Sequence, residues 1–462
     1  MNTDTIAAIA TGMTPSGIGI IRVSGEDAFS IASSVFRRKN NKPLTEYEDH
    51  KAYFGYIYDN DHVLDEVILL VFKSPYSYTG ENIVEIQCHG GILVMNRILE
   101  LCIDSGARCA DPGEFTKRAF LNGRIDLTGA EAVMDLISAK SDLARKNSVS
   151  VLNGVLYKKI KSIREEILLS IARIEAALDD PEHMSLDGYE EELNENIKKI
   201  QADIDVLIKS YDNGKIIKEG INTAIVGKPN AGKSSILNMF LNEERAIVTE
   251  IAGTTRDTLE ESVNIGGITL NLIDTAGIRE SDDLVEKIGI ERSSKAIEKA
   301  DLVLFVTDSS KDPDSEDDKI ISMLGDKKTI CLLNKQDLKQ EMTVQEIKSH
   351  FEDMELKPEF LKISASTGEG KEELIELIKG MFFNGELSFN DEVMVSNLRQ
   401  KNELIKANEA LTKVRESIEN SMPEDFLSID LMSAYASLGE IIGEEVNDDL
   451  VDKIFSEFCM GK

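Results

Sequence analysis

Residues 227–234, which read GKPNAGKS, have the spacing of a loop that binds nucleotide phosphates. The apolar run Ile221–Val226 before them predicts a buried strand, and Ser235–Leu241 after them predicts the start of a helix. Glycines let such a loop turn its backbone N–H groups toward phosphate oxygens, and the helix N-terminus adds positive charge. Lys233 would reach the β- and γ-phosphates and the Ser234 hydroxyl would bind Mg²⁺, so this stretch predicts a nucleoside triphosphatase.

Three motifs that each follow a predicted strand indicate which base is bound. Asp274–Gly277 (DTAG) would lie beside Mg²⁺ and the γ-phosphate. Asn334–Asp337 (NKQD) supplies an aspartate that can accept hydrogen bonds from N1 and the exocyclic amine of guanine, and Ser364–Ser366 can close over the base. Thr255 is the expected second hydroxyl ligand of Mg²⁺. One such motif alone is a weak signal, but this order after the phosphate loop specifies GTP rather than ATP.

The position directly after the DTAG turn does not carry the glutamine that orients the attacking water in Ras-like enzymes. Ile278 stands there instead, and its side chain cannot hold a water molecule. Glu286, beyond the turn, and a cation near Asn230 in the phosphate loop are two candidates for the missing function. The residues alone favour a solvated acidic loop over a catalytic role for Glu286, because runs of charge are usually solvated faces.

Four stretches outside the GTPase motifs resemble those of a known family. They are GIGIIRVSG (17–25), SYTGENIVEIQCHGG (77–91), DPGEFTKRAFLNGRIDLTGAEAVMDLI (111–137) and FCMGK (458–462). They resemble the tRNA wobble-uridine modification GTPases, the MnmE (TrmE) family, and the likeness covers essentially all 462 residues.

This resemblance implies a homodimeric enzyme that hydrolyses GTP to GDP and phosphate. It implies a flavin- and NADH-dependent partner of the MnmG family, joined with the enzyme in a heterotetramer. Together they would add a 5-carboxymethylaminomethyl (or aminomethyl) group to the wobble uridine of certain tRNAs. The one-carbon donor would be 5-formyl-tetrahydrofolate or a related folate.

The resemblance also implies activation by K⁺ through dimerisation of the GTPase domains, with the cation in place of an arginine finger. The matching K⁺ ligands are Asn230, Thr249, Ile251 and Thr254. Ser234 and Thr255 would hold Mg²⁺, and Glu286 matches the family's general base, acting with Lys233 and Thr255. The residues expected to contact nucleotide or cation are Asn230, Ala231, Gly232, Lys233, Ser234, Ser235, Thr249, Glu250, Ile251, Ala252, Gly253, Thr254, Thr255, Asp274, Thr275, Ala276, Gly277, Asn334, Lys335, Asp337, Ser364, Ala365 and Ser366.

A folate pocket is implied near the N-terminus. Its matching residues are Arg22, Glu85, Arg124 and Lys462. Arg and Lys suit the glutamate carboxylates of a folate, and Glu85 suits the N–H donors of the pterin. Cys459 keeps its place in the terminal motif, where both a reactive and a merely packed thiol remain open. Asp180 and His183 depart from the family's usual DFPEE pattern, which leaves the role of that loop open.

Composition limits the surroundings and partners of the chain. The formal net charge is −32, whereas nucleic-acid binders are usually basic, so any contacts to tRNA should be local or supplied by a basic partner. The sequence contains no apolar run long enough to span a bilayer and no basic start of a signal peptide, which predicts a cytoplasmic protein away from membranes. The five cysteines form no CxxC pair and are expected to be reduced thiols.

The periodicity predicts a multi-domain architecture. An α+β domain (1–118) with five short strands and one clear helix, Gly91–Ser105, is followed by an all-α helical domain (119–215). An α/β P-loop GTPase (Ras-like) domain (216–382), entered through a linker at Asn213–Gly214 and Gly220, is inserted before the second helical part (383–462). The helices expected outside the GTPase domain are Leu127–Lys140, Ser162–Leu178, Glu190–Ile208, Asp391–Ile418, Ser428–Ile442 and Asp448–Phe458.

Two alternative functions remain at this stage. One is a GTP-dependent assembly or ribosome-associated factor without modification chemistry, and folate binding by residues 1–118 distinguishes it, because an assembly factor has no reason to bind folate. The other is a folate-dependent transferase with a vestigial GTPase, and the intact nucleotide motifs argue against it.

Overall fold

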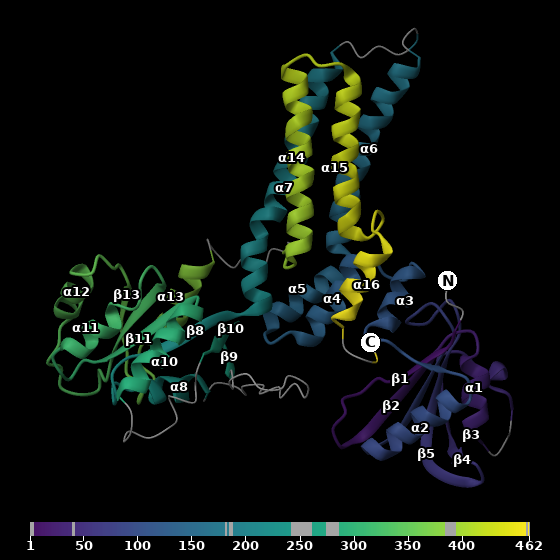
Figure 1. The fold of residues 1–462 in the computed structure, drawn as a ribbon, viewed down its shortest axis with the longest axis horizontal. Coiled ribbons are helices and arrows are strands. Elements are labelled where there is room, and N and C mark those ends of the chain that lie inside the picture. The colour runs from purple at the N-terminus through teal and green to yellow at the C-terminus, as the bar shows by residue number, and fades with distance from the viewer. Residues whose placement is uncertain are drawn as a thin grey trace. The chain divides into compact units, whose positions relative to one another are not determined.

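The structure, a computed structural model, forms two compact units (Figure 1). It describes residues 4–38, 42–180, 183, 188–241, 261–273, 286–383, 394–458 and 461, with the backbone alone for 286–292 and 448. The first unit comprises 1–134, 151–194 and 409–462, and the second comprises 135–150 and 195–408. These units group the chain differently from the predicted domains, whose boundaries stay predictions.

The first unit contains a seven-stranded sheet with the order β3-β4-β5-β6-β2-β1-β7. Its strands are β1 Ile6–Ile9, β2 Ser16–Ser24, β3 Phe36–Arg37, β4 Lys51–Asp59, β5 His62–Phe72, β6 Ile83–Gly90 and β7 Arg108–Cys109. Helices α1 (Ala28–Val35) and α2 (Ile92–Asp104) cover one face, where their apolar residues pack with the inward side chains of β2 and β6. On the other face, Phe115 of α3 (Glu114–Leu121) packs against β1.

These elements confirm the predicted α+β class and correct one detail. All five predicted strands are present, and the helix predicted at Gly91–Ser105 is α2. The sequence analysis was wrong to predict only one clear helix here, because α1 is short, and three serines interrupt its apolar pattern (AFSIASSV).

Long helices make up the rest of the first unit. Helix α6 (Val155–Asp179) packs against α15 (Glu424–Ile442), and α16 (Asp448–Ser456) follows near the C-terminus. The Arg164 guanidinium lies 3.9 Å from the ring centroid of Tyr435 and forms an ion pair with Glu444. Helices α4 (Leu127–Ser138), α5 (Asp142–Leu152), α7 (Tyr189–Glu219) and α14 (Leu398–Glu419) each run from one unit into the other.

The second unit is built on a six-stranded sheet with the order β13-β12-β11-β8-β10-β9. Its strands are β8 Ile221–Val226, β9 Glu261–Ile265, β10 Ile268–Leu272, β11 Leu302–Asp308, β12 Lys328–Asn334 and β13 Glu359–Lys362. All neighbouring pairs are parallel except β9 with β10. The helices are α8 Lys233–Leu241, α10 Glu286–Lys299, α11 Ser315–Ile321, α12 Val344–Glu352 and α13 Lys371–Phe382.

Helices cover both faces of this sheet, as predicted for a P-loop GTPase domain. Ile225 and Leu304 point into one apolar cluster, while the next residues, Val226 and Phe305, point into a second cluster on the opposite face. Such alternation along parallel strands is the packing of an α/β domain. The predicted fold class is therefore confirmed. Among the described residues, no helix is both long and apolar enough to cross a membrane.

The predicted linker at Asn213–Gly214 is wrong, because α7 continues through it to Glu219. Glycine is required there by packing: a Cβ on Gly214 would lie 2.2 Å from the carbonyl oxygen of Val395. The helix predicted from Asp391 begins instead at Leu398, and just before it the Asn397 side-chain oxygen accepts a hydrogen bond from the backbone N–H of Arg399 (2.9 Å).

Replacing Gly214 by Ala should destabilise the protein by about 1–3 kcal/mol, because backbone atoms rather than a flexible side chain block the new methyl group. Urea unfolding followed by circular dichroism measures this effect. Gly380→Ala is the matched control, since Gly380 is exposed in α13 and a Cβ there meets nothing within 4 Å. That control should be neutral or more stable by up to about 1 kcal/mol. Equal effects of the two substitutions would contradict the close approach to Val395.

Candidate guanine-nucleotide site

Three of the predicted nucleotide motifs, namely the phosphate loop, Asn334–Asp337 and Ser364–Ser366, lie at one edge of the six-stranded sheet. Strands β8, β11, β12 and β13 are parallel, so their carboxyl ends lie at the same edge. The phosphate loop follows β8, Asn334 ends β12, and Ser364 lies just after β13. Ligands of open parallel sheets bind outside this edge, which places phosphate and base motifs around one site.

Close packing fixes the shape of the phosphate loop. Gly227 has a φ of 149°, and a Cβ there would lie 2.1 Å from the carbonyl oxygen of Val306. Gly232 has a φ of 103°, and its Cβ would lie 2.1 Å from Nδ2 of Asn334. Asn230 is exposed with a φ of 63°, a left-handed conformation that asparagine tolerates better than most residues. The two glycines are therefore required by both the turn and the available space.

Lys233 and Ser234 open helix α8 beside this loop. The ammonium of Lys233 donates hydrogen bonds to the carbonyl oxygens of Gly227 (2.8 Å) and Lys228 (2.7 Å), so the side chain folds back over the loop. Ser234 and Ser235 are exposed. A serine hydroxyl is a hard oxygen ligand of the kind that Mg²⁺ prefers, and the residues present fit that ion.

The amide of Asn334 connects the phosphate and base motifs. Its Nδ2 donates to the carbonyl oxygen of Ala231 (2.9 Å), and its Oδ1 accepts from the backbone N–H of Ala365 (3.0 Å). Asn334 is only 2% exposed. Its side chain therefore holds two loops of the site together.

Asp337 presents a carboxylate at the position expected for the base. The Ser364 hydroxyl donates to Asp337 Oδ1 (2.6 Å) and lies 3.0 Å from the Ser366 hydroxyl. The hydrogen bond from Ser364, with a smaller effect of the Lys335 charge, lowers the pKa of Asp337. The carboxylate is thus ionised at neutral pH and is held in place by the Ser364 hydroxyl.

Asp308 is a member of the site that the sequence analysis missed. The Lys335 ammonium lies 2.7 Å from Asp308 Oδ2, and the Ser310 hydroxyl donates to Asp308 Oδ1 (2.6 Å). Burial alone would raise the pKa of Asp308, but the hydrogen bonds from Lys335 and Ser310 outweigh it, and the pKa is lowered. An aspartate at the end of a buried strand was the available signal, although its partner lies 27 residues away.

Arg22 and Glu85 of the predicted folate pocket lie together in the first unit. They are direct neighbours on β2 and β6, and their charged atoms approach to 2.8 Å. The Arg22 guanidinium lies 5.4 Å from the Tyr78 ring centroid and 5.5 Å from that of Phe115, and it donates to the carbonyl oxygen of Gly461 (3.5 Å). The site thus combines a cation, an anion and aromatic rings, which fits a folate.

Comparison with known proteins identifies the family. Residues 5–124 match the model of the GTP-binding protein TrmE N-terminus, and residues 127–459 match the MnmE helical domain. A tRNA modification GTPase MnmE from Lachnoclostridium phytofermentans is 52% identical and aligns with 100% of both chains. Those from Clostridioides difficile and Acetivibrio thermocellus are each 47% identical over 99% of this chain and 99% of their own. The chain belongs to the MnmE family.

Some residues that the MnmE resemblance implies lie outside the described residues. They are Thr249, Glu250, Ile251, Ala252, Gly253, Thr254, Thr255, Asp274, Thr275, Ala276, Gly277, Cys459 and Lys462. Glu286 is the first residue of α10, where the backbone alone is described. The roles of these residues in this MnmE family member stay predictions.

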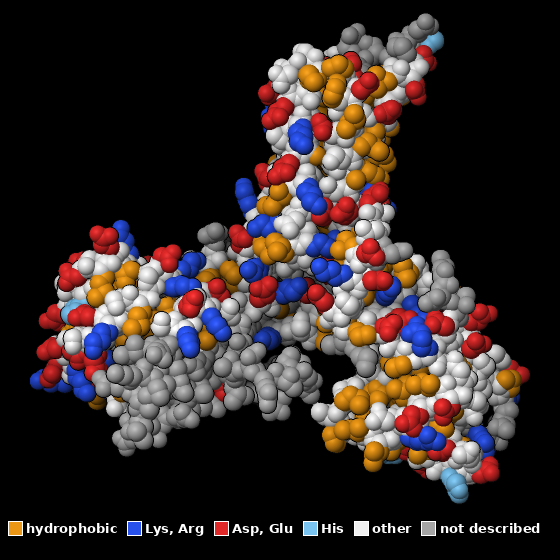
Figure 2. All heavy atoms as spheres, viewed as in Figure 1, with side chains coloured by type: hydrophobic (Ala, Val, Ile, Leu, Met, Phe, Trp, Pro, Cys, Tyr) orange, Lys and Arg blue, Asp and Glu red, His pale blue; other side chains and the backbone are white. Residues whose placement is uncertain are grey.

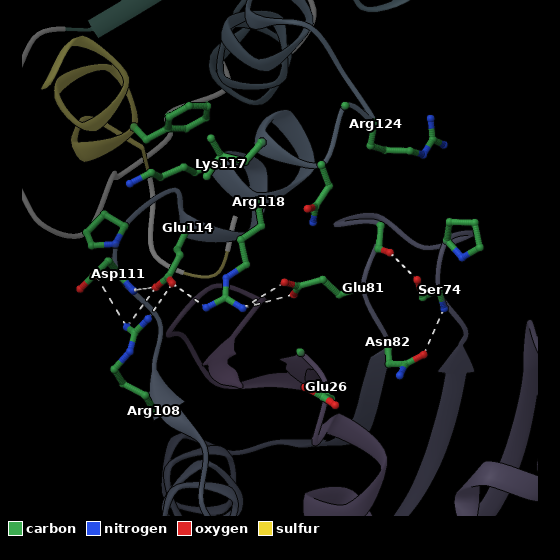
Figure 3. A pocket seen from close by; sticks show the side chains of 18 of the residues that line it. Glu26, Ser74, Glu81, Asn82, Arg108, Asp111, Glu114, Lys117, Arg118 and Arg124 are labelled. Atoms are coloured by element: carbon green, nitrogen blue, oxygen red, sulfur yellow. Dashed lines mark hydrogen bonds and ion pairs between the residues drawn. The ribbon is translucent and has the colours of Figure 1, made fainter. Parts of the chain in front are cut away.

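Arg124, the third residue of the predicted folate pocket, lines a cavity in the first unit of this member of the MnmE family. The cavity has a volume of about 1170 Å³, and its walls include neither Arg22 nor Glu85 (Figure 3). Arg118, 8% exposed at its side chain, dominates one wall and forms ion pairs with Glu114 (2.9 Å) and Glu81 (3.3 Å).

The charges of this cavity are largely paired with one another. Arg108 joins Glu114 (2.7 Å), and Lys117 pairs with Asp452 of α16. Burial would raise the pKa of Glu114, but hydrogen bonds from Arg108 and Arg118 lower it below its ordinary value. The pair of Lys117 with Asp452 ties α3 to the C-terminal helix, and these two residues are too distant in sequence for the contact to be predicted.

Replacing Asp337 by Asn should weaken GTP binding at least about tenfold, since a hydrogen bond to a charged group contributes roughly 1.5–3 kcal/mol. An amide can donate as well as accept, so xanthosine triphosphate, with an oxygen in place of the amine, should bind better than to the wild type. Competition with a fluorescent guanine nucleotide measures both affinities. Asp326→Asn, in an exposed turn, is the control and should bind like wild type. Unchanged GTP affinity in Asp337→Asn would remove this residue from the base contact.

Proposed function

We propose that this protein hydrolyses GTP to GDP and phosphate and that hydrolysis serves tRNA modification. The single observation that carries the nucleotide assignment is the Asp337 carboxylate, held by Ser364 in a site that Asn334 connects to the phosphate loop. Membership of the MnmE family, whose relatives are named tRNA modification GTPases, supports both halves of the proposal.

The residues of the phosphate loop and α8 would share the work of binding. Backbone N–H groups of 230–234 would surround the β-phosphate, as the left-handed turn at Asn230 and Gly232 allows. Lys233 would exchange its two carbonyl partners for phosphate oxygens, which accept more strongly because they are charged. Ser234 and Thr255 would hold Mg²⁺, which neutralises charge that develops between the β- and γ-phosphates.

Water activation needs groups other than the usual glutamine. Glu286, at the start of α10, would take the proton of the attacking water as the bond from the γ-phosphorus to its bridging oxygen breaks. Asn230, Thr249, Ile251 and Thr254 would hold K⁺ in place of an arginine finger. The exposed position of Asn230 in the phosphate loop supports this role. Dimerisation of the GTPase domains would complete the site.

The first unit would bind a one-carbon folate. The Arg22 guanidinium suits a folate carboxylate, Glu85 suits pterin N–H donors, and the adjacent Tyr78 ring offers a stacking surface. The carbonyl oxygen of Gly461 accepts a hydrogen bond from Arg22, and Lys462, the next residue in the sequence, would join this pocket. Arg124, which lines the cavity of about 1170 Å³, would bind a carboxylate of the folate tail.

tRNA and a flavin- and NADH-dependent MnmG-family partner complete the proposed system, as a cytoplasmic heterotetramer that modifies the wobble uridine. On the face shown in Figure 2, Lys and Arg are interspersed with Asp and Glu, which supports local contacts to tRNA rather than a long basic track. Hydrolysis would change the arrangement of domains, because switch segments ordered by the γ-phosphate are the usual readout of GTPases. A GTP-dependent assembly factor is the alternative, and it would not bind folate.

GTP turnover should be at least about tenfold faster in KCl than in NaCl at equal ionic strength, because a bound cation replaces a group worth several orders of magnitude in rate. Release of phosphate from the full chain, measured in each salt with Mg²⁺ present, tests this. Equal turnover in the two salts would contradict K⁺ binding by Asn230 and favour the assembly-factor alternative.

Replacing Glu286 by Ala should preserve GTP binding and lower turnover about 10²–10⁴-fold, the usual contribution of a general base. Glu298→Ala, on the exposed side of the same helix, is the matched control. Single-turnover hydrolysis and nucleotide affinity are measured for both variants. Normal hydrolysis by Glu286→Ala would show that Glu286 is not the general base, and it would favour the interpretation of this segment as a solvated acidic loop.

A further inference from the structure

The ammonium of Lys228, the second residue of the phosphate loop, lies between two carboxylates that form an acidic clamp. Its nitrogen lies 2.8 Å from Asp314 Oδ2 and 2.7 Å from Asp317 Oδ2. The side chain of Lys228 is 15% exposed and that of Asp317 is 1% exposed. Although burial alone would lower the pKa of Lys228, the hydrogen bonds that its ammonium donates to the two aspartates raise it, so the side chain is charged at neutral pH.

The two carboxylates of this clamp are themselves fixed by the start of helix α11. Asp314 is the N-cap and accepts from the backbone N–H of Glu316 (2.8 Å). Asp317 Oδ2 accepts from the backbone N–H of Asp314 (3.1 Å), which completes a capping box. Lys228 is therefore anchored to groups that cannot readily follow it if the loop moves.

The backbone of Lys228 acts on the other side of the loop. Its carbonyl oxygen accepts a hydrogen bond from Lys233 (2.7 Å), and its neighbour Gly227 packs directly against Val306 of β11. The side chain and the carbonyl of one residue thus connect α11 to the lysine expected to bind the phosphates. A displacement of Lys228 would change the start of the loop and the position of Lys233 together.

We propose that Lys228 is a positioning residue of the nucleotide site, whose ion pairs with Asp314 and Asp317 hold the phosphate loop in its binding shape. This inference rests on the proposed binding of guanine nucleotides. In this role the ammonium of Lys228 stays with the two carboxylates and acts on the nucleotide through the backbone of the loop.

A loop that already has its binding shape loses little backbone conformational entropy when it binds phosphate. When the clamp is lost, that ordering has to occur on binding, so GDP and GTP should be weakened alike, since both carry the β-phosphate. Once GTP is bound, the loop is ordered again, and turnover at saturation should change little. A higher KM with a nearly unchanged kcat is therefore the signature of this role.

The test compares Lys228→Met with Lys228→Arg in the full chain. Methionine keeps most of the apolar stem and removes the charge, whereas arginine keeps the charge. We expect Lys228→Met to bind GDP and GTP about tenfold or more weakly in titrations with fluorescent nucleotides, and Lys228→Arg to recover most of the affinity. Lys348→Met is the matched control, because Lys348 forms an exposed pair with Glu352 (3.7 Å) in the same unit.

Several outcomes would overturn this inference. Nucleotide affinity within twofold of wild type in Lys228→Met would do so, even if thermal stability falls, because that pattern describes a merely structural ion pair. Failure of Lys228→Arg to recover affinity would also count against it. If Lys228→Met does not fold, Asp314→Asn removes one exposed partner, and it should weaken binding in the same direction. A wild type that binds neither GDP nor GTP would instead refute the proposed function.

Discussion

The hydrogen bonds of the Asn334 amide are the interaction on which the nucleotide site depends. The phosphate loop and the base motifs come from strands that are separate in sequence, and the sheet alone brings only their ends to the same edge. One amide that donates to Ala231 and accepts from Ala365 fixes the distance between them. The space at Gly232, where any side chain would meet Asn334, follows from the same close approach. Position 232 therefore needs glycine for its neighbour as well as for its φ.

Three further contacts hold residues of the site in place around this amide. Gly227 rests on the backbone of β11, Asp308 at the end of the same strand holds Lys335, and Ser364 after β13 holds Asp337. Each functional side chain is thus oriented by a group on a different strand. The charged groups at this edge are therefore already oriented before a nucleotide binds, and their reorganisation on binding would cost little free energy.

Much of this arrangement could be predicted from the sequence. The strand–loop–helix order around GKPNAGKS and the strand before NKQD depend on residues that are close in sequence. Such local patterns of apolar residues and glycine can be recognised without knowledge of the fold. Helices α2, α6 and α15 were predictable for the same reason. Gly214 was misread, because a glycine that admits a neighbouring backbone looks the same in sequence as one that ends a helix.

Contacts between distant residues could not be predicted. Lys228 and Asp317 are both ordinary charged residues in sequence, and only the fold shows that they meet and that Asp317 is buried. The cavity beside Arg118 depends on pairs such as Lys117 with Asp452, which are separated by most of the chain. Composition gives the total charge but not which charges are already paired.

The number of cations that are already paired decides how the net charge of −32 bears on nucleic-acid binding. Arg22, Arg118, Arg164 and Lys228 have side chains 16%, 8%, 5% and 15% exposed, and each is paired with carboxylates of its own unit. A polyanion would have to displace these carboxylates from the cations, so the four cations are poorly placed to bind one. RNA phosphates would therefore have to bind to exposed cations of this chain or to cations of another protein. The excess of carboxylates would repel RNA phosphates, and it would confine contact to places where cations outnumber carboxylates.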